Sequence, residues 1–186
     1  MKEVLKYYKD FPKEGIVFVD IIPYLQNKSI FKQLIAQVAA ACTAPTIIAP
    51  EARGFLFAAP LLTEAEGVEN IIPVRKSGKL PFAEGDLREV VIEKEYGSDK
   101  LYYRLSDIAA GRVNGDVFEV TILDDVLATG GTAEGLAESL EACKINLDGK
   151  EYGVKVKEFV FIVEIAELGG KARLERLAPV RSIAVI

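Results

Sequence analysis

The chain alternates short apolar runs with stretches whose apolar residues recur at helical spacing. Residues 29–42 place apolar side chains three or four positions apart, which predicts an amphipathic helix. Residues 46–49 form a short apolar run typical of a buried strand. Residues 55–66 have a helical composition, and Pro60 is expected to shorten or bend that helix. The pattern therefore begins with a helix, a strand and a broken helix.

The same alternation continues to the end of the chain. Further strands are predicted over residues 70–74, 118–123, 156–163 and 181–186, and further helices over residues 133–143 and 170–177. Apolar strands that alternate with helices predict a doubly wound α/β fold, in which helices cover both faces of a mostly parallel sheet. Ligands of such folds bind beyond the carboxyl ends of the strands, so the loops at that edge are expected to form the binding site.

One region interrupts the alternation. Residues 75–104 are rich in charged residues, Gly and Pro, and they contain strand-like pieces at residues 89–93 and 100–104. The sequence Gly97-Ser98-Asp99 between them is typical of a turn, so a β-hairpin is predicted. A long excursion at the ligand-binding edge of a sheet often acts as a lid.

Composition narrows the class of protein. The 186 residues are 50% hydrophobic, which suits one domain with a substantial core. The net charge of −5, without a basic stripe, argues against non-specific binding of nucleic acid. The sequence contains neither an apolar stretch of membrane-spanning length nor the pattern of a signal peptide, so a cytoplasmic protein is expected.

The cysteines and the lack of histidine limit the chemistry. Cys42 and Cys143 are far apart in apolar helical patterns, and with no histidine in the chain a zinc site is not expected. We interpret both cysteines as buried reduced thiols. Catalysis by a Ser–His or Cys–His pair is excluded, so acid–base chemistry falls to carboxylates, Lys or Tyr.

The strongest candidate for chemistry is the segment VTILDDVLATGGT, residues 120–132. An apolar strand leads into Asp124 and Asp125, and Gly130-Gly131-Thr132 opens the next helix. Small residues there let backbone N–H groups approach an anion at the positive end of the helix dipole, and Thr129 and Thr132 add hydroxyl donors. The carboxylates suit vicinal hydroxyls or a hydrated Mg²⁺. A sugar with a 5′-phosphate and free 2′ and 3′ hydroxyls satisfies both halves of the segment.

This segment resembles the signature for 5-phosphoribosyl 1-pyrophosphate (PRPP) in the type I phosphoribosyltransferases. Further blocks resemble the adenine phosphoribosyltransferases and occur in the order of that family: DFPKEGIVF and DIIP at residues 10–18 and 20–23, EARGF at 51–55, RKSGKLP at 75–81, EYG at 95–97 and EIAELGGKARL at 164–174. The resemblance implies the type I phosphoribosyltransferase fold in a single domain over residues 1–186. It also implies a small N-terminal hood at residues 1–28, a flexible hairpin lid at residues 75–104 and a homodimer.

The resemblance further implies a reaction of purine salvage, in which the 5-phosphoribosyl group of PRPP passes to adenine and gives AMP and pyrophosphate. The sugar and its 5′-phosphate are expected at Asp124, Asp125, Ala128, Thr129, Gly130, Gly131 and Thr132. The pyrophosphate is expected at Glu51, Ala52, Arg53, Arg75, Lys76 and Lys79, and in this family such a cation can come from the partner subunit. Arg53 is expected to take the negative charge that grows on the leaving group.

For the base, the resemblance implies that Phe18 stacks on the purine while the backbone of Val17 and Val19 binds its edge. Leu127 is expected to cover the other face. Glu95 is expected to be the acid–base group near the purine N7. Mg²⁺ is the expected cofactor, held mainly by substrate and water rather than by a protein cage.

The sequence leaves two alternatives to adenine transfer open, because it departs from the family pattern at three places. Val19 stands where the family usually carries Arg, Pro50 stands where a small residue is commoner, and the segment between Pro81 and Glu95 is a few residues longer than usual. The same chemistry on a 6-oxopurine is one alternative, although no obvious base-reading Lys precedes the final strand. A PRPP-binding regulator without turnover is the other, although 186 residues leave little room for an added DNA-binding module.

Overall fold

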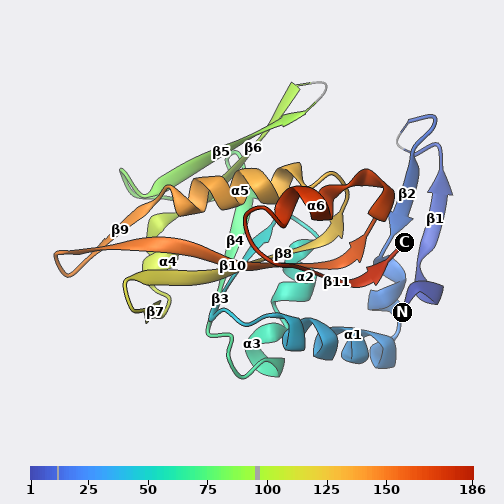
Figure 1. The fold of residues 1–186 in the computed structure, drawn as a ribbon, viewed down its shortest axis with the longest axis horizontal. Coiled ribbons are helices and arrows are strands. Elements are labelled where there is room, and N and C mark those ends of the chain that lie inside the picture. The colour runs from blue at the N-terminus through green and yellow to red at the C-terminus, as the bar shows by residue number, and fades with distance from the viewer. Residues whose placement is uncertain (12, 95–96) are drawn as a thin grey trace.

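The computed structural model describes residues 1–11, 13–94 and 97–186 (Figure 1). One sheet forms the centre of the molecule. Its strands follow the order β11 (Val180–Val185), β10 (Lys150–Glu164), β8 (Val117–Leu127), β3 (Thr46–Pro50), β4 (Asn70–Lys76), β6 (Gly97–Arg104) and β5 (Leu87–Lys94). The pairings from β11 to β4 are parallel, and those of β4 with β6 and of β6 with β5 are antiparallel.

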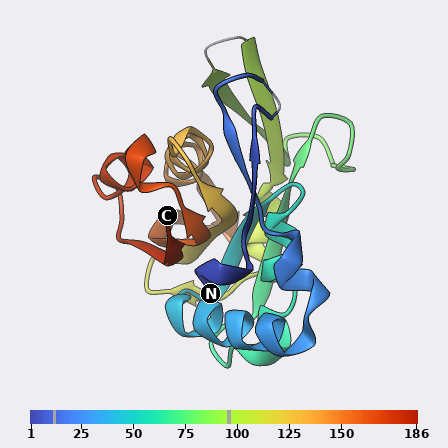
Figure 2. The ribbon, with the colours of Figure 1, turned by 90° about the vertical axis from the view of Figure 1, so that its right-hand side faces the viewer.

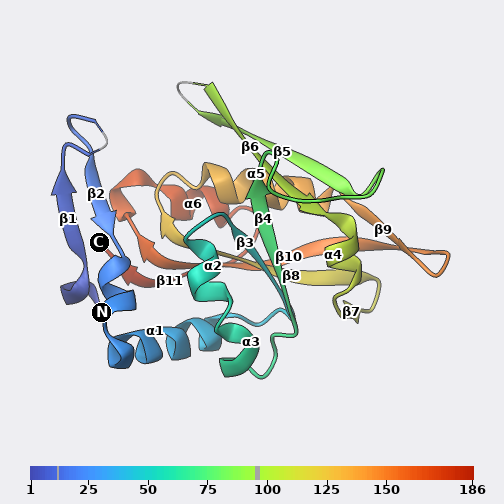
Figure 3. The same ribbon diagram turned by 180° about the vertical axis from the view of Figure 1, so that it is seen from behind.

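Helices cover both faces of this sheet. On one face lie α5 (Gly131–Glu141) and α6 (Gly170–Leu174), and on the other lie α1 (Lys28–Ala41), α2 (Gly54–Ala58) and α3 (Leu61–Glu64) (Figures 1 and 3). Pro60 stands directly before α3 and separates it from α2, as its fixed backbone angle predicts. The doubly wound, mostly parallel α/β fold is therefore confirmed.

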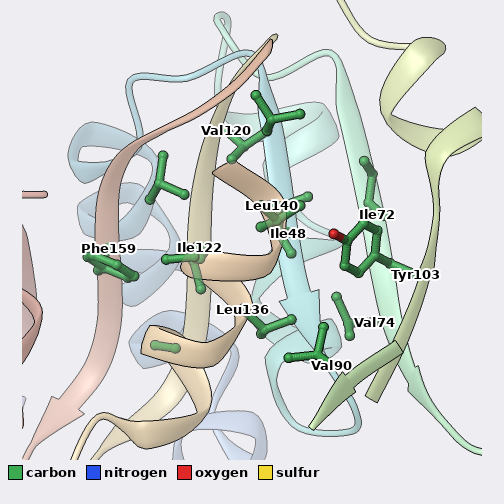
Figure 4. Close-up of a cluster of buried hydrophobic side chains, with 14 of the residues drawn as sticks. Ile48, Ile72, Val74, Val90, Tyr103, Val120, Ile122, Leu136, Leu140 and Phe159 are labelled. Carbon is green, nitrogen blue, oxygen red and sulfur yellow. The ribbon is translucent and has the colours of Figure 1, made fainter. Parts of the chain in front are cut away.

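Each face has its own apolar core. Figure 4 shows Leu136 and Leu140 of α5 against Ile48, Ile122 and Phe159 of the sheet, all of them fully buried. The helices α1 and α2 cover the opposite core. The apolar faces predicted for the helices at residues 29–42 and 133–143 therefore pack on the sheet.

The excursion at residues 75–104 contains the predicted β-hairpin. Strands β5 and β6 pair over their whole length, and Val90, Ile92 and Leu101 are buried beneath α5. The prediction of a turn at Gly97-Ser98-Asp99 is wrong, because these residues belong to β6 and pair with residues 92–94 of β5. Their turn-like composition is overridden by the cross-strand pairing that buries the apolar neighbours. The connection between the strands lies outside the described residues.

A second hairpin precedes the sheet and was not predicted. It consists of β1 (Lys6–Lys9) and β2 (Val17–Asp20), which pair only with each other, and it projects in the same direction as the β5–β6 hairpin (Figure 2). All four residues of β1 are exposed, so the strand carries no alternation of apolar and polar positions. Short helical turns precede and follow it at Lys2–Val4 and Ile22–Gln26.

Strands β8 and β10 are longer than the apolar runs that predicted them. Short partner strands, β7 (Val113–Asn114) and β9 (Lys144–Leu147), pair with their first residues, and Phe118 and Ile145 at this end are buried in the core. At the other end, β8 continues to Leu127 through its parallel pairing with β10, so Asp124 and Asp125 lie within the strand and not after it. The helix α4 (Leu105–Ala109) and the turn η3 (Ala166–Leu168) complete the described elements.

One buried carboxylate joins three elements of the fold. Glu158 of β10 is 2% exposed and lies where the register between β8 and β10 shifts. Its Oε1 accepts the backbone N–H groups of Thr43 at 2.9 Å and of Ala44 at 3.3 Å. The hydroxyls of Thr43 and Thr121 also donate to this carboxylate. The loop before β3 is thereby fastened to the two central strands.

We predict that Glu158→Ala lowers the free energy of unfolding by about 2–4 kcal/mol, because it leaves buried donors without an acceptor. Urea denaturation followed by circular dichroism measures the change. The matched control is Glu151→Ala, since Glu151 is exposed on the same strand and pairs loosely with Lys144 at 3.8 Å. Equal losses in the two variants would contradict this account of Glu158.

Candidate active site

A cavity of about 440 Å³ opens at the carboxyl ends of β3 and β8. Three segments that lie far apart in the sequence form much of its wall: residues 16–19 of the N-terminal hairpin, residues 50–53 after β3 and residues 124–126 of β8. Residues Ile92, Asp99 and Leu101 of the β5–β6 hairpin line it as well. The cavity therefore lies at the edge of the sheet where the fold class places a ligand.

A smaller hollow of about 140 Å³ lies at the N-terminus of α5. It is lined by Asp124, by residues 126–133 and by two apolar side chains, Ile92 and Phe161. Gly130 has a φ of 80°, a left-handed conformation that glycine adopts without strain, and α5 begins at the next residue. The first N–H groups of a helix have no intrahelical acceptor, so this hollow is suited to an anion.

The two adjacent carboxylates line the larger cavity. Asp124 Oδ1 accepts the backbone N–H of Asp125 at 2.8 Å. Burial raises the pKa of Asp124 well above its ordinary value, and the negative charge of Asp125 raises it further. The side chain of Asp125 is 8% exposed, and its Oδ2 has no hydrogen-bond partner among the described residues. Such a buried acceptor favours a hydroxyl or a hydrated cation as a ligand.

Arg53 connects these carboxylates to the N-terminal hairpin. Its Nε lies 2.7 Å from Asp125 Oδ2, an ion pair without the alignment of a hydrogen bond. Its guanidinium carbon also lies 5.5 Å from the centre of the Phe18 ring, within range of a cation–π contact. Gly54 lets this loop approach β8 closely, since a Cβ on it would lie 3.3 Å from Asp124 Oδ1. Arg53 therefore contacts both a carboxylate and an aromatic ring of the cavity.

The other residues predicted to bind pyrophosphate do not all reach the cavity. Glu51, Ala52 and Lys76 line it, and the peptide bond between Glu51 and Ala52 is cis. Glu51 Oε2 accepts the backbone N–H of Lys76 at 2.9 Å and Nε of Arg75 at 3.0 Å. These bonds, that to the Lys76 backbone first, lower the pKa of Glu51. Arg75 is thereby held away from the cavity, and Lys79 is exposed outside its lining.

Val17, Phe18 and Val19, which were predicted to bind a base, line the cavity. Phe18 lies between Arg53 and Phe11, whose ring meets it edge-on at 5.1 Å. The Val19 side chain is 5% exposed and packs in the core beneath the hairpin, where an apolar residue is favoured.

Leu127 is 1% exposed, packs in the core beneath α5 and lines only the smaller hollow. Its neighbour Val126 is partly buried and lines both the larger cavity and the smaller hollow. Sequence reasoning missed Val126. It also missed Asp99, which was assigned to a turn. Glu95 lies outside the described residues.

Solved structures that share this fold include adenine phosphoribosyltransferases. The crystal structure of adenine phosphoribosyltransferase from Thermoanaerobacter pseudethanolicus superposes with a TM-score of 0.79 and 34% identity, covering 100% of this chain and 97% of that chain. The Saccharomyces cerevisiae enzyme, complexed with adenine and D-2,5-dideoxy-2,5-imino-altritol 1,6-bisphosphate, has a TM-score of 0.73 and 35% identity, covering 96% and 93%.

Sequence comparison identifies the family. No protein-family model matches the chain. The adenine phosphoribosyltransferase of Maridesulfovibrio salexigens is 38% identical over 177 residues, which cover 94% of this chain and 92% of that protein. Adenine phosphoribosyltransferase 1 of Saccharomyces cerevisiae is 36% identical over 187 residues, covering 97% and 88%. The chain belongs to the adenine phosphoribosyltransferase family.

The raised pKa of Asp124 predicts a cost in stability. In the folded protein this carboxyl keeps its proton to a higher pH than in the unfolded chain, so the free energy of unfolding falls as the pH rises above the ordinary value of 3.8. We expect Asp124→Asn to be more stable than the wild type at neutral pH, with a difference that shrinks toward pH 3.8. Denaturant titrations at several pH values measure it.

The control for this prediction is Asp116→Asn. Asp116 is an exposed carboxylate whose pKa is lowered by its pairing with Lys150, so this change should give no gain in stability at neutral pH. A loss of stability in Asp124→Asn at neutral pH would show that the charge of Asp124 is well compensated in the folded protein.

Proposed function

We propose that the protein transfers the 5-phosphoribosyl group of PRPP to adenine and releases AMP and pyrophosphate. One observation carries the proposal. The segments that resemble the base, pyrophosphate and PRPP blocks of the family lie far apart in the sequence but line one cavity, in a chain that belongs to the family. The complex of the yeast relative with adenine and a bisphosphate analogue supports it.

The sugar phosphate of PRPP occupies the two hollows in this proposal. The 5′-phosphate lies against residues 128–132, where the free N–H groups at the start of α5 and the helix dipole favour a negative charge. The ribose hydroxyls face Asp124 and Asp125 and donate hydrogen bonds to their carboxylate oxygens, among them the buried Oδ2 of Asp125.

The pyrophosphate lies beside residues 51–53 and Lys76. As the base N9 forms its bond to C1′, the bond from C1′ to the pyrophosphate oxygen breaks, and its electron pair stays on the leaving group. Arg53 neutralises that charge. To do so its guanidinium leaves Asp125 and Phe18, which frees the carboxylate for ribose and the ring for the base.

Mg²⁺ belongs to the proposal as a partner of the substrate. In this proposal the ion is held mainly by PRPP and water, beside Asp124 and Asp125. When bound, the ion supplies positive charge to the leaving pyrophosphate.

Adenine stacks on Phe18 in this proposal, and the backbone of Val17 and Val19 binds its edge. We place Val126 rather than Leu127 on the opposite face, because Val126 lines the cavity and Leu127 does not. Glu95 is the proposed acid–base group at N7, a role that rests on the resemblance of residues 95–97 to the family.

The organisation of the chain is also part of the proposal. Residues 1–28 act as a hood and residues 75–104 as a lid within a single domain, supported by the two hairpins that contribute to the cavity wall. The protein acts as a homodimer in the cytoplasm, where its two free cysteines stay reduced. No helix in the described part of the chain is long and apolar enough to cross a membrane.

The direct test is turnover with PRPP, Mg²⁺ and adenine, hypoxanthine, guanine or xanthine in turn, followed by release of pyrophosphate. We expect release with adenine and little with the 6-oxopurines. Turnover only with hypoxanthine or guanine would refute the choice of base and keep the chemistry. Binding of PRPP without turnover on any base would support the regulator instead.

Two substitutions separate the proposed roles. Asp125→Asn should weaken PRPP binding about tenfold or more, because a charged acceptor of the ribose hydroxyls is lost. Glu95→Gln should lower kcat about 100-fold and leave PRPP affinity largely intact, because it removes acid–base assistance to the base. Steady-state kinetics and calorimetry measure both quantities.

Glu89→Gln is the control for the hairpin, since Glu89 pairs with Lys100 and Tyr102 on the exposed side of the same strands. Full activity of Glu95→Gln would refute its proposed role. An Asp125→Asn variant with unchanged PRPP affinity would place the ribose elsewhere.

A further inference from the structure

The short helix α6 makes direct backbone contact with the loop that precedes α5. Gly170, its first residue, has no room for a side chain. A Cβ there would lie 2.2 Å from the carbonyl oxygen of Ala128 and 3.0 Å from the backbone nitrogen of Gly130. The contact is reciprocal, because a Cβ on Gly130 would lie 3.2 Å from the carbonyl oxygen of Gly170. The two glycines therefore let α6 hold the conformation of residues 128–130.

The same helix also sets the charge beside this loop. Glu134, in the first turn of α5, carries a carboxylate at the helix end that is suited to an anion. Arg173 of α6 donates from Nε to Glu134 Oε2 at 2.6 Å, and Arg176 donates from Nη2 to Oε1 at 3.1 Å. Nη1 of Arg173 lies beside Gly131, since a Cβ on Gly131 would be 3.7 Å from it.

The position of Glu134 creates a conflict that these arginines resolve. A carboxylate near a helix N-terminus stabilises the helix but repels a phosphate bound at the same end. The hydrogen bond from Arg173 is the main cause that lowers the pKa of Glu134, and Arg176 lowers it further. The two guanidinium groups thereby offset the negative charge of Glu134. The first turn of α5 thus keeps its acidic residue without losing its attraction for an anion.

We propose that α6 is the support of the phosphate site, with Gly170 and Arg173 as positioning residues for the 5′-phosphate of PRPP. Gly170 holds the shape of the loop, and Arg173 balances the charge of Glu134 beside it. This inference rests on the proposed function and adds residues that lie outside the PRPP segment. Gly170 and Arg173 should therefore affect binding of the sugar phosphate of PRPP and not binding of its pyrophosphate.

The first test is Gly170→Ala, measured by calorimetry with Mg²⁺ and either PRPP or pyrophosphate alone. The added methyl group forces the loop and α6 apart by about 1 Å, so the Kd for PRPP should rise about tenfold or more. The Kd for pyrophosphate should stay within about twofold of the wild type, because Gly170 lies outside the lining of the larger cavity, where residues 51–53 are. Unchanged affinity for PRPP would overturn the role of Gly170.

The matched control is Gly111→Ala. A Cβ on Gly111 would lie 2.7 Å from Thr46 Oγ1, so this variant is crowded as well. The residues that this Cβ would meet, Thr46, Ile108 and Asn70, line neither hollow, whereas Ala128 and Gly130 beside Gly170 line the smaller one. The control variant should lose stability and keep its Kd for PRPP. An equal rise in Kd for the two variants would show a general loss of folding and overturn the specific role.

The second test does not depend on how well Gly170→Ala folds. Arg173→Gln should weaken PRPP binding about threefold, because part of the Glu134 charge becomes uncompensated. Adding Glu134→Gln to the same chain should restore the affinity, whereas a purely structural role of the ion pair predicts no rescue. Failure of the double variant to recover would overturn the role of Arg173.

The two proposals fail in different ways. A wild-type protein that neither binds PRPP nor turns over adenine would refute the proposed function. A wild-type protein that does both, combined with wild-type PRPP affinity in Gly170→Ala and Arg173→Gln, would refute this inference alone.

Discussion

The parallel pairing of β8 with β3 on one side and β10 on the other decides where the candidate site lies. Parallel strands end at the same edge of a sheet, so the loop with Arg53, the carboxylates of β8 and the start of α5 meet there although they are far apart in the sequence. Glu158 of β10 fastens the loop before β3 to β8 and β10. The N-terminal hairpin then closes the cavity from outside the sheet.

The cavity brings together charged side chains, each of which would be unfavourable if it were buried without a partner. Asp124 is buried beside Asp125, which raises its pKa, and Asp125 is paired with Arg53. Arg53 in turn lies over the ring of Phe18. A substrate that carries hydroxyls, an aromatic base and a pyrophosphate offers each of these groups a new partner, so the proposed function explains why a folded protein keeps such a costly cluster.

Much of this organisation could be predicted from the sequence. Helical spacing and apolar runs gave the doubly wound sheet, because buried strands and amphipathic helices carry strong patterns. The exposed strand β1 carries no such pattern, and β8 continues past its apolar run through Asp124 and Asp125 by pairing with β10. The contact of Arg53 with Phe18, the place of Val126 and the need for Gly170 depend on tertiary packing, which the local sequence does not express.

We propose that one cavity holds the whole substrate and that Arg53 moves from Phe18 and Asp125 to the pyrophosphate. A crystal structure of the protein with adenine and a non-reacting analogue of PRPP tests it most directly. In that complex the 5′-phosphate should lie against residues 128–132 and the ribose hydroxyls at Asp124 and Asp125. The guanidinium of Arg53 should lie on the pyrophosphate, and adenine should stack on Phe18. A ligand bound elsewhere, or an Arg53 that still pairs with Asp125 over the Phe18 ring, would contradict this proposal.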